Sequence, residues 1–124
     1  MNTTPLESQE QTALFDWAEY QKNTMPELAL MFHIPNGGSR NKIEAARLKR
    51  QGVKKGVSDV FLSCPKGGYH GLYIEMKRQK GGVLTKEQSD WLELVAKYGY
   101  KVAVCYGAEA AIKEITDYLK GESA

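Results

Sequence analysis

The chain has few of the residues that build zinc sites or disulfide frameworks. Its 124 residues include only two cysteines and two histidines. Cys64 and Cys105 lie far apart, with neither CxxC spacing nor histidines nearby, which argues against a zinc site and against a disulfide framework. We expect both cysteines to be small buried hydrophobes. His33 and His70 stand without companions, and neither is assigned a catalytic role.

Long apolar runs are also missing. No stretch reaches the roughly eighteen apolar residues that a membrane span requires. The N-terminal sequence MNTTPLESQEQ has neither the basic nor the apolar region of a secretory signal. These absences predict a cytoplasmic protein without a membrane partner. The length is close to that of a common single domain, so we expect one domain over residues 1–124.

The net charge of +2 conceals an uneven distribution of charge. Residues 40–55 carry seven basic side chains and one acidic side chain, which are Arg40, Lys42, Arg47, Lys49, Arg50, Lys54, Lys55 and Glu44. A local basic surface suits a polyanion such as nucleic acid, because binding releases condensed counterions. A solvated helix face is the alternative, and charge alone does not separate the two.

The apolar periodicity predicts alternating helices and strands. The expected elements are a helix over 6–21, a strand over 28–34, a helix from Ser39 or Asn41 to Gly52, strands over 56–64 and 71–79, a helix over 85–98, a strand over 100–106 and a helix over 109–120. The turn at 65–68 makes the two central strands an antiparallel hairpin. This order predicts an α/β protein with a mixed β-sheet flanked by helices.

The two hairpin strands carry the candidate catalytic residues. Because side chains alternate along a strand, Tyr73, Glu75 and Lys77 share one face, opposite an apolar face of Leu72, Ile74 and Met76. On the paired strand Asp59 lies among apolar residues. Two carboxylates on adjacent strands repel unless a cation lies between them, and oxygen ligands favour Mg²⁺ or Mn²⁺. Lys77 could then orient an attacking water, although a surface Glu-Lys pair is the plainer interpretation.

The strings GVSDVFL and IEMKR together resemble the PD-(D/E)XK nuclease motif, in particular that of the VRR-NUC family. The resemblance extends over nearly the whole chain. Its other matching blocks are E-x-x-x-Q at Glu7 and Gln11, IPNGGSRN at 34–41, AARLKRQGVKKGV at 45–57 and TKEQSDW at 85–91. One departure is Ser58, which stands where the family usually has proline. Proline there would fix a backbone angle rather than bind metal, so activity is still expected.

The resemblance implies a restriction-endonuclease-like core and a metal-dependent nuclease. Asp59 and Glu75 become metal ligands, the Met76 carbonyl a third, and Lys77 the catalytic lysine. Stand-alone bacterial and phage members of the family resemble Holliday-junction resolvases that act as homodimers on structured DNA. We therefore expect a Mg²⁺-dependent endonuclease, with Mn²⁺ as a substitute, in a bacterial or phage-infected cell.

Three polar residues lie on the apolar sides of predicted helices, and their position there suggests a specific role. Glu7 and Glu10 share a helix side with Leu14. Glu7 matches the family's acidic position and could reach the metal through water, whereas Glu10 is the weaker candidate and could simply form a cap. Gln88 lies with Trp91 on its helix. It could bond Lys77, a metal-bound water or phosphate, or it could complete a capping box with Thr85.

The remaining candidates concern DNA and a second subunit. The turn of Asn36, Gly37, Gly38 and Arg40 enters the basic helix, where backbone N–H groups and a guanidinium can hold phosphate. Further predicted DNA contacts are Arg47, Lys49, Arg50, Lys54 and Lys55. Surplus aromatics suit a dimer interface, and the candidates are Trp91, Tyr98, Tyr100 and Tyr118, although ordinary core residues are the alternative for the same four side chains.

Two other functions use the same residues. A DNA-binding module that kept the fold without catalysis would not require carboxylates facing a polyanion, so the acidic pair argues against it. A nuclease with another specificity, for a DNA sequence or for RNA, uses similar chemistry. The residues do not distinguish that nuclease from one that cuts branched DNA.

Overall fold

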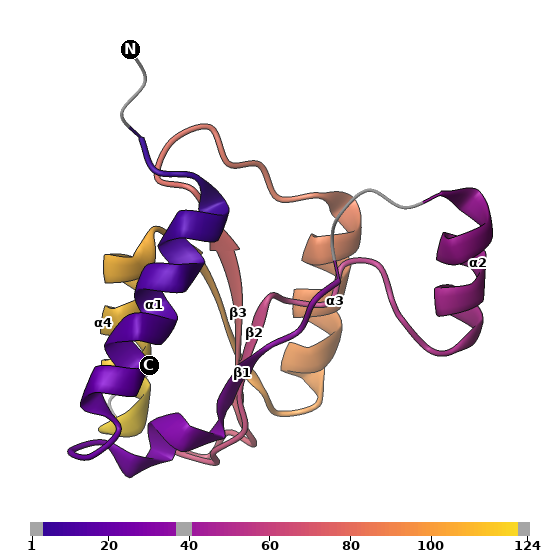
Figure 1. Cartoon of the computed structure of the whole chain (residues 1–124). Coiled ribbons are helices and arrows are strands. Elements are labelled where there is room, and N and C mark those ends of the chain that lie inside the picture. The colour runs from indigo at the N-terminus through magenta and orange to yellow at the C-terminus, as the bar shows by residue number, and fades with distance from the viewer. Residues whose placement is uncertain (1–3, 37–40, 122–124) are drawn as a thin grey trace.

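A computed structural model describes residues 4–36 and 41–121 of the chain. In chain order, the elements are α1 (Glu7–Gln21), the 3₁₀ helix η1 (Pro26–Leu30), β1 (Met31–His33), α2 (Lys42–Arg50), β2 (Val60–Leu62), β3 (Leu72–Lys77), α3 (Lys86–Lys97), β4 (Lys101–Tyr106) and α4 (Ala108–Leu119). Figure 1 shows α1 and α4 side by side on one side of the sheet, α3 on the other side, and α2 standing farther out. The predicted mixed sheet flanked by helices is confirmed.

The four strands lie in the order β1-β2-β3-β4. β2 pairs antiparallel with both β1 and β3, and β4 pairs parallel with β3 after the chain has passed through α3. In the β2–β3 ladder Val60 lies opposite Ile74 and Phe61 opposite Tyr73. The predicted hairpin is therefore confirmed, and continuing its register by one residue places Asp59 opposite Glu75.

The two faces of β3 have different surroundings. Leu72, Ile74 and Met76 are fully buried in the main core, which also contains Leu14 of α1 and Ile115 of α4. This apolar face packs on the α1 and α4 layer, as its unbroken hydrophobic character predicts.

The opposite face of the sheet carries a cluster of aromatic rings. Tyr73 stacks on Phe61 with ring centroids 4.4 Å apart, and Trp91 of α3 meets Tyr73 edge-on at 5.7 Å. Tyr100 contacts Tyr73 at 5.3 Å. The sheet is thus covered on this side by α3 and by aromatic side chains rather than by a second aliphatic core.

Two predicted strands are much shorter than the sequence suggested, and the strand predicted over 71–79 is regular over Leu72–Lys77. The strand predicted over 28–34 contains only Met31–His33, because Pro26 at the start of η1 has a fixed φ that suits a helical turn and continues it to Leu30. The strand predicted over 56–64 is regular only over Val60–Leu62. In both cases the apolar run extends beyond the segment that finds a neighbouring strand.

The helix α2 buries none of its residues, unlike the other three α-helices. It begins at Asn41, whose side chain accepts the Glu44 N–H at 2.7 Å, so Asn41 fills the predicted capping role. The alternative cap, Ser39, lies outside the described residues. We call α2 together with the return segment 51–55 the basic arm, because it carries most of the basic cluster.

A glycine holds the end of the basic arm against α3. Gly56 has φ +94°, and a Cβ there would lie 2.5 Å from the carbonyl oxygen of Glu87. Only glycine allows this approach without displacing backbone. The chain that leads into Asp59 is therefore fixed against the first turn of α3.

One candidate interface aromatic belongs to the core instead. Tyr118 is 1% exposed, and its hydroxyl donates to the Cys64 carbonyl at 2.6 Å. Its predicted availability for an interface is wrong, because the ring fills the space between α4 and the sheet end. Cys64 and Cys105 are buried and unpaired, as predicted. Among the residues that the structure describes, no helix has the length and apolar character needed to cross a membrane.

Candidate active site

The pairing of β2 with β3 fixes the two central carboxylates. Asp59 ends the segment entering β2, and its Oδ2 accepts the backbone N–H of Met76 at 2.8 Å. Its carbonyl oxygen accepts the Ile34 N–H at 2.7 Å and lies 2.8 Å from His33 Nδ1. Asp59 is therefore held from both neighbouring strands, with its side chain beside that of Glu75.

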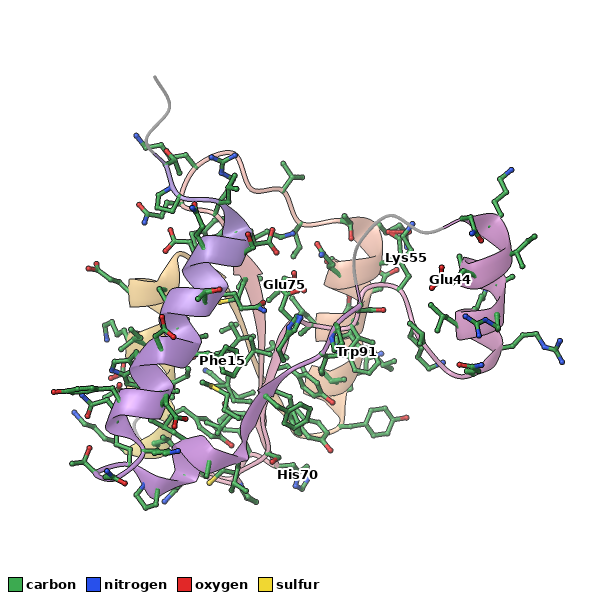
Figure 2. All side chains as sticks on the ribbon, in the orientation of Figure 1. Phe15, Glu44, Lys55, His70, Glu75 and Trp91 are labelled. Atoms are coloured by element: carbon green, nitrogen blue, oxygen red, sulfur yellow. The ribbon has the colours of Figure 1, made fainter. Side chains whose placement is uncertain are left out.

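A third carboxylate comes from the first turn of α1. Ligand oxygens of Glu7, Asp59 and Glu75 all lie within 4.8 Å of one another, and we call these three residues the acid cluster. Figure 2 shows Glu75 in the region between α1 and α3. The predicted assembly of Asp59 with Glu75 and Glu7 is thus what the fold produces, although the three residues lie far apart in sequence.

Burial makes this cluster electrostatically unfavourable without a cation. Glu75 is 1% exposed, and burial together with neighbouring Asp59 raises its pKa to about 9. Burial, and then Asp59, also raises the pKa of Glu7. Glu75 Oε1 is buried without a hydrogen-bond partner. An orphaned buried oxygen among three carboxylates fits a hard divalent cation such as Mg²⁺ or Mn²⁺.

Lys77 and Gln88 complete the site beside the acid cluster. The Lys77 side chain is only 7% exposed, and its Nζ lies 3.8 Å from Glu75 Oε2 and donates to Gln88 Oε1 at 3.0 Å. Gln88 Nε2 donates to Glu75 Oε2 at 3.1 Å. One amide therefore bridges the lysine and the carboxylate, which keeps the ammonium beside the cluster instead of fully paired with it.

Both interpretations of Gln88 hold at once. Its Oε1 also accepts the Thr85 N–H at 2.9 Å, and its own N–H donates to Thr85 Oγ1 at 3.1 Å, which is a complete capping box. The start of α3 and the polar site are therefore built from the same side chain. A helix cap is a local feature that sequence reveals, whereas its contact with β3 depends on tertiary packing.

Glu10 has a structural role outside the acid cluster. It is 6% exposed, and its Oε1 accepts the Ala108 N–H at 3.1 Å while its Oε2 accepts from Gln79 Nε2 at 2.7 Å. The Gly107 that precedes α4 has no side chain to cap that helix, so Glu10 provides the cap from α1. The sequence suggested a cap for Glu10 but did not reveal its partners; the bare glycine before α4 was the available signal.

The predicted DNA-binding residues of the basic arm are all exposed, whereas part of the turn before the arm lies outside the described residues. Arg47, Lys49 and Arg50, which we call the arm cations, are exposed on α2, and Lys54 and Lys55 are exposed beyond it. The Asn36 side chain donates to the Lys54 carbonyl. Lys55 lies 3.9 Å from Glu87 in a loose, exposed pair. Arg40, Gly37 and Gly38 lie outside the described residues.

Two predicted features stay predictions at this point. The Met76 side chain is buried in the core, so only its carbonyl could serve a metal. Of the remaining interface aromatics, Trp91 and Tyr100 are half-buried in the aromatic cluster, while Tyr98 is 71% exposed. Tyr98 is therefore the most accessible of the predicted set.

The fold and the acidic site define a nuclease domain of the PD-(D/E)XK type. A family model described as the VRR-NUC domain matches residues 6–109, and the chain belongs to this family. A solved structure described as a VRR_NUC domain protein is 32% identical, with a TM-score of 0.83 over 96% of this chain and 92% of that chain. Comparison with curated proteins gives no match. Membership confirms the predicted nuclease class and implies DNA as a substrate.

Proposed function

We propose that residues 1–124 form a single-domain endonuclease that requires a divalent metal, Mg²⁺ by preference, and hydrolyses phosphodiesters in branched DNA. The observation that carries this proposal is the acid cluster with Lys77 at its edge. Three carboxylates around the buried Glu75 are electrostatically costly in the metal-free protein, and a purely structural site of this size would not need them.

Glu7, Asp59 and Glu75 are the residues that would hold the ion, and the Met76 carbonyl is a further candidate. A bound divalent ion supplies Lewis-acid chemistry, lowering the pKa of a water and neutralising phosphate charge. The buried Glu75 Oε1 gives the strongest support for this assignment, because it has no hydrogen-bond partner in the protein. Asp59 Oδ2 is already engaged by the Met76 N–H, which fixes the carboxylate plane.

Lys77 is the side chain that would contact the phosphate. Lys77 is buried next to Glu75, and its Nζ has donors to spare after its bond to Gln88. These donors can bind a non-bridging phosphate oxygen or orient the attacking water, and they are positioned before the substrate arrives. Gln88 serves as the positioning residue, because it holds the ammonium 3.0 Å from its Oε1 and away from a closed ion pair with Glu75.

The basic arm favours a substrate with phosphates in more than one direction. The arm cations stand on a helix that buries nothing of its own and projects beyond the α3 side of the sheet (Figure 1). A linear duplex runs along one axis, whereas a branched molecule presents diverging arms. A basic helix that projects away from the body of the domain can contact one arm while the acid cluster lies at another.

We propose further that the active form is a homodimer. Resolving a four-way junction takes two cuts in strands related by two-fold symmetry, and each chain offers one acid cluster, so a C2 dimer presents the matching pair. Exposed Tyr98, with the half-buried Trp91 and Tyr100 nearby, is the support that this chain offers. Light scattering should give a dimer, and nick mapping on a mobile four-way junction should give paired symmetric cuts. A monomer that makes unpaired cuts would contradict this.

The test of the activity compares labelled four-way junction, duplex, single strand and RNA, each with Mg²⁺, Mn²⁺ or EDTA. We expect cleavage of the junction with either metal, none in EDTA, and much weaker cleavage of duplex. Equal cutting of duplex and junction would remove the branched-DNA proposal, and preferential cutting of RNA would replace it. Cleavage that persists in EDTA would remove the metal.

A variant separates catalysis from binding. Asp59→Asn should abolish cleavage and leave junction binding equal or tighter, because one negative charge facing the phosphates is lost. Asp16→Asn, at an exposed position of α1, is the matched control and should cut like the unaltered protein. Junction binding by a protein that never cleaves, whatever the metal, would instead indicate a DNA-binding module.

A further inference from the structure

A groove opens on the aromatic side of the sheet, between β3, α3 and the end of the basic arm. Its walls include the rings of Tyr73 and Trp91 and the aliphatic side chains of Val53 and Val57, with Asn36 and Lys54 contributing polar groups. We call it the base groove. It is lined by none of the acid cluster, so the catalytic assignment does not account for it.

The walls of the base groove are held in place before any ligand binds. Tyr73 is fixed by Phe61, which stacks on it at 4.4 Å with an interplanar angle of 29°, and by the perpendicular ring of Trp91. The Asn36 amide donates to the Lys54 carbonyl and so ties the segment after β1 to the arm. A preformed groove with aromatic and aliphatic walls binds a flat ligand with little loss of side-chain entropy.

The base groove lies one step along the strand from the catalytic residues. Tyr73 and Glu75 are on the same face of β3, and two residues of a strand span about 6.6 Å. Lys54 lies at the wall of the groove and the arm cations lie beyond it, and all of these side chains attract phosphate. A ligand that has an anionic backbone at the acid cluster and a flat aromatic ring one step away is a nucleotide.

We propose that the base groove receives an unstacked nucleobase of the nucleotide next to the cut phosphate. This inference rests on the proposed nuclease function and deepens it. A base inside a duplex is paired and stacked and cannot enter without being extruded, whereas a base at a branch point is already unstacked or easily made so. The groove therefore selects branched DNA through the base that the branch releases, in addition to any selection by the shape of the phosphate backbone.

The contacts that the groove offers are stacking and edge-to-face contacts, with limited reading of sequence. Aromatic side chains bind bases of any identity, because every base has an apolar face. Asn36 is already bonded to Lys54, so its amide offers few donors for a specific base edge. We therefore expect tolerance of base identity together with strong dependence on the presence of a base.

The test measures binding without cleavage, using Asp59→Asn and a four-way junction whose cut site has first been mapped with the active protein. In one series the nucleotide beside the cut site is replaced by an abasic nucleotide, and in a second series by 2-aminopurine. We expect the abasic junction to bind roughly 5- to 100-fold more weakly, as the loss of one base–aromatic stack implies. The 2-aminopurine fluorescence should change on binding, as its surroundings change from the DNA stack to the protein rings.

Variants then locate the effect in the base groove. In the same Asp59→Asn background, Trp91→Leu should bind intact and abasic junctions equally, because the ring that contacts the base is gone. Tyr20→Leu is the control: it removes an exposed aromatic ring of α1 that lies outside the groove, and the preference for the intact base should remain. Val53→Phe, placed at the exposed lip to fill the groove, covers the case in which Trp91→Leu does not fold.

The outcomes distinguish the inference from the function on which it rests. Equal affinity of the Asp59→Asn protein for intact and abasic junctions would overturn the base groove and leave the nuclease proposal standing. A preference that persists in both Trp91→Leu and Val53→Phe would overturn it as well, and a side chain of a second protein chain would then be the better occupant. Failure to bind any branched DNA would overturn the proposed function and the inference together.

Discussion

Replacement of Glu75 by glutamine should stabilise the protein while removing its activity. Glu75 is fully buried, and its pKa is raised to about 9 from an ordinary value of 4.5. The folded protein therefore binds this proton more tightly than the unfolded chain does. The stability contributed by protonated Glu75 is fully present below pH 4.5 and is lost as the pH rises from there towards 9.

The size of the effect follows from that window. Each pH unit above 4.5 costs the metal-free protein about 1.4 kcal/mol of unfolding free energy, so the total is about 3 kcal/mol at pH 7. Glutamine carries no charge, keeps the shape, and can still accept from Gln88 Nε2 as Glu75 does now. In EDTA the Glu75→Gln variant should be about 3 kcal/mol more stable than the unaltered protein at pH 7, and nearly equal to it near pH 4.5.

Metal should cancel this advantage of the variant at pH 7. An ion that binds only the folded state at a concentration 100 times its Kd adds about 3 kcal/mol, and the variant has lost a ligand. Urea unfolding at pH 4.5 and pH 7, each in EDTA and in Mg²⁺, measures the free energy of unfolding of both proteins under all four conditions. Glu93→Gln, on the exposed face of α3, is the control and should not alter the pH dependence. A Glu75→Gln protein that is less stable in EDTA at pH 7, or whose advantage does not vary with pH, would refute the reasoning.

Three further changes should have measurable effects. Ser58→Ala should stabilise the fold by about 1 kcal/mol, since the buried Ser58 hydroxyl has no partner, whereas Ser63→Ala removes a hydroxyl that donates to a backbone carbonyl and should not stabilise. Gly56→Ala should lower the free energy of unfolding by at least about 2 kcal/mol, and by more than Gly52→Ala does. Both glycines have positive φ, but only at Gly56 would the added Cβ meet backbone, so equal losses of stability would refute the contact. Alanine at all three arm cations should leave thermal stability unchanged and lower the slope of log K against log salt by about 0.9 per lost phosphate contact, whereas an unchanged slope would make α2 a merely solvated helix.

The strand rules predicted the centre of the site because β3 obeys them. The alternation of apolar and polar residues over 72–77 is unbroken, and the hairpin turn has two adjacent glycines. Those local features decided which face Glu75 and Lys77 would share and which strand would lie beside them. The hairpin turn made the two strands neighbours, so Asp59 could be expected near Glu75, whereas their register is known only from the β2–β3 ladder, because the turn pairs Lys66 with Tyr69 in a register shifted by one residue.

Features that depend on packing between distant segments were not predictable in the same way. The pattern of α2, with Ile43, Ala46 and Leu48, predicts a helix but cannot show that no partner covers it. The run at 28–34 is apolar throughout, and only the position of the neighbouring β2 decides that pairing starts at Met31. Glu10 is found by its place on a buried stripe, yet its role depends on α4, which lies almost a hundred residues further along the chain.

Two kinds of sequence feature gave the correct predictions. Local patterns of apolar residues predict helices and strands, and a charged residue at a position expected to be buried indicates a functional site. Glu75 and Lys77 are buried charged residues on a strand, and Glu7 is a half-buried acid in the first turn of a helix. Sequences that fold well avoid such conflicts unless function requires them, because each costs stability. Ser58 is the instructive contrast: it too is a buried polar group without a partner, but it faces the core side with Val60, so its conflict serves no ligand and should be removable without loss of activity.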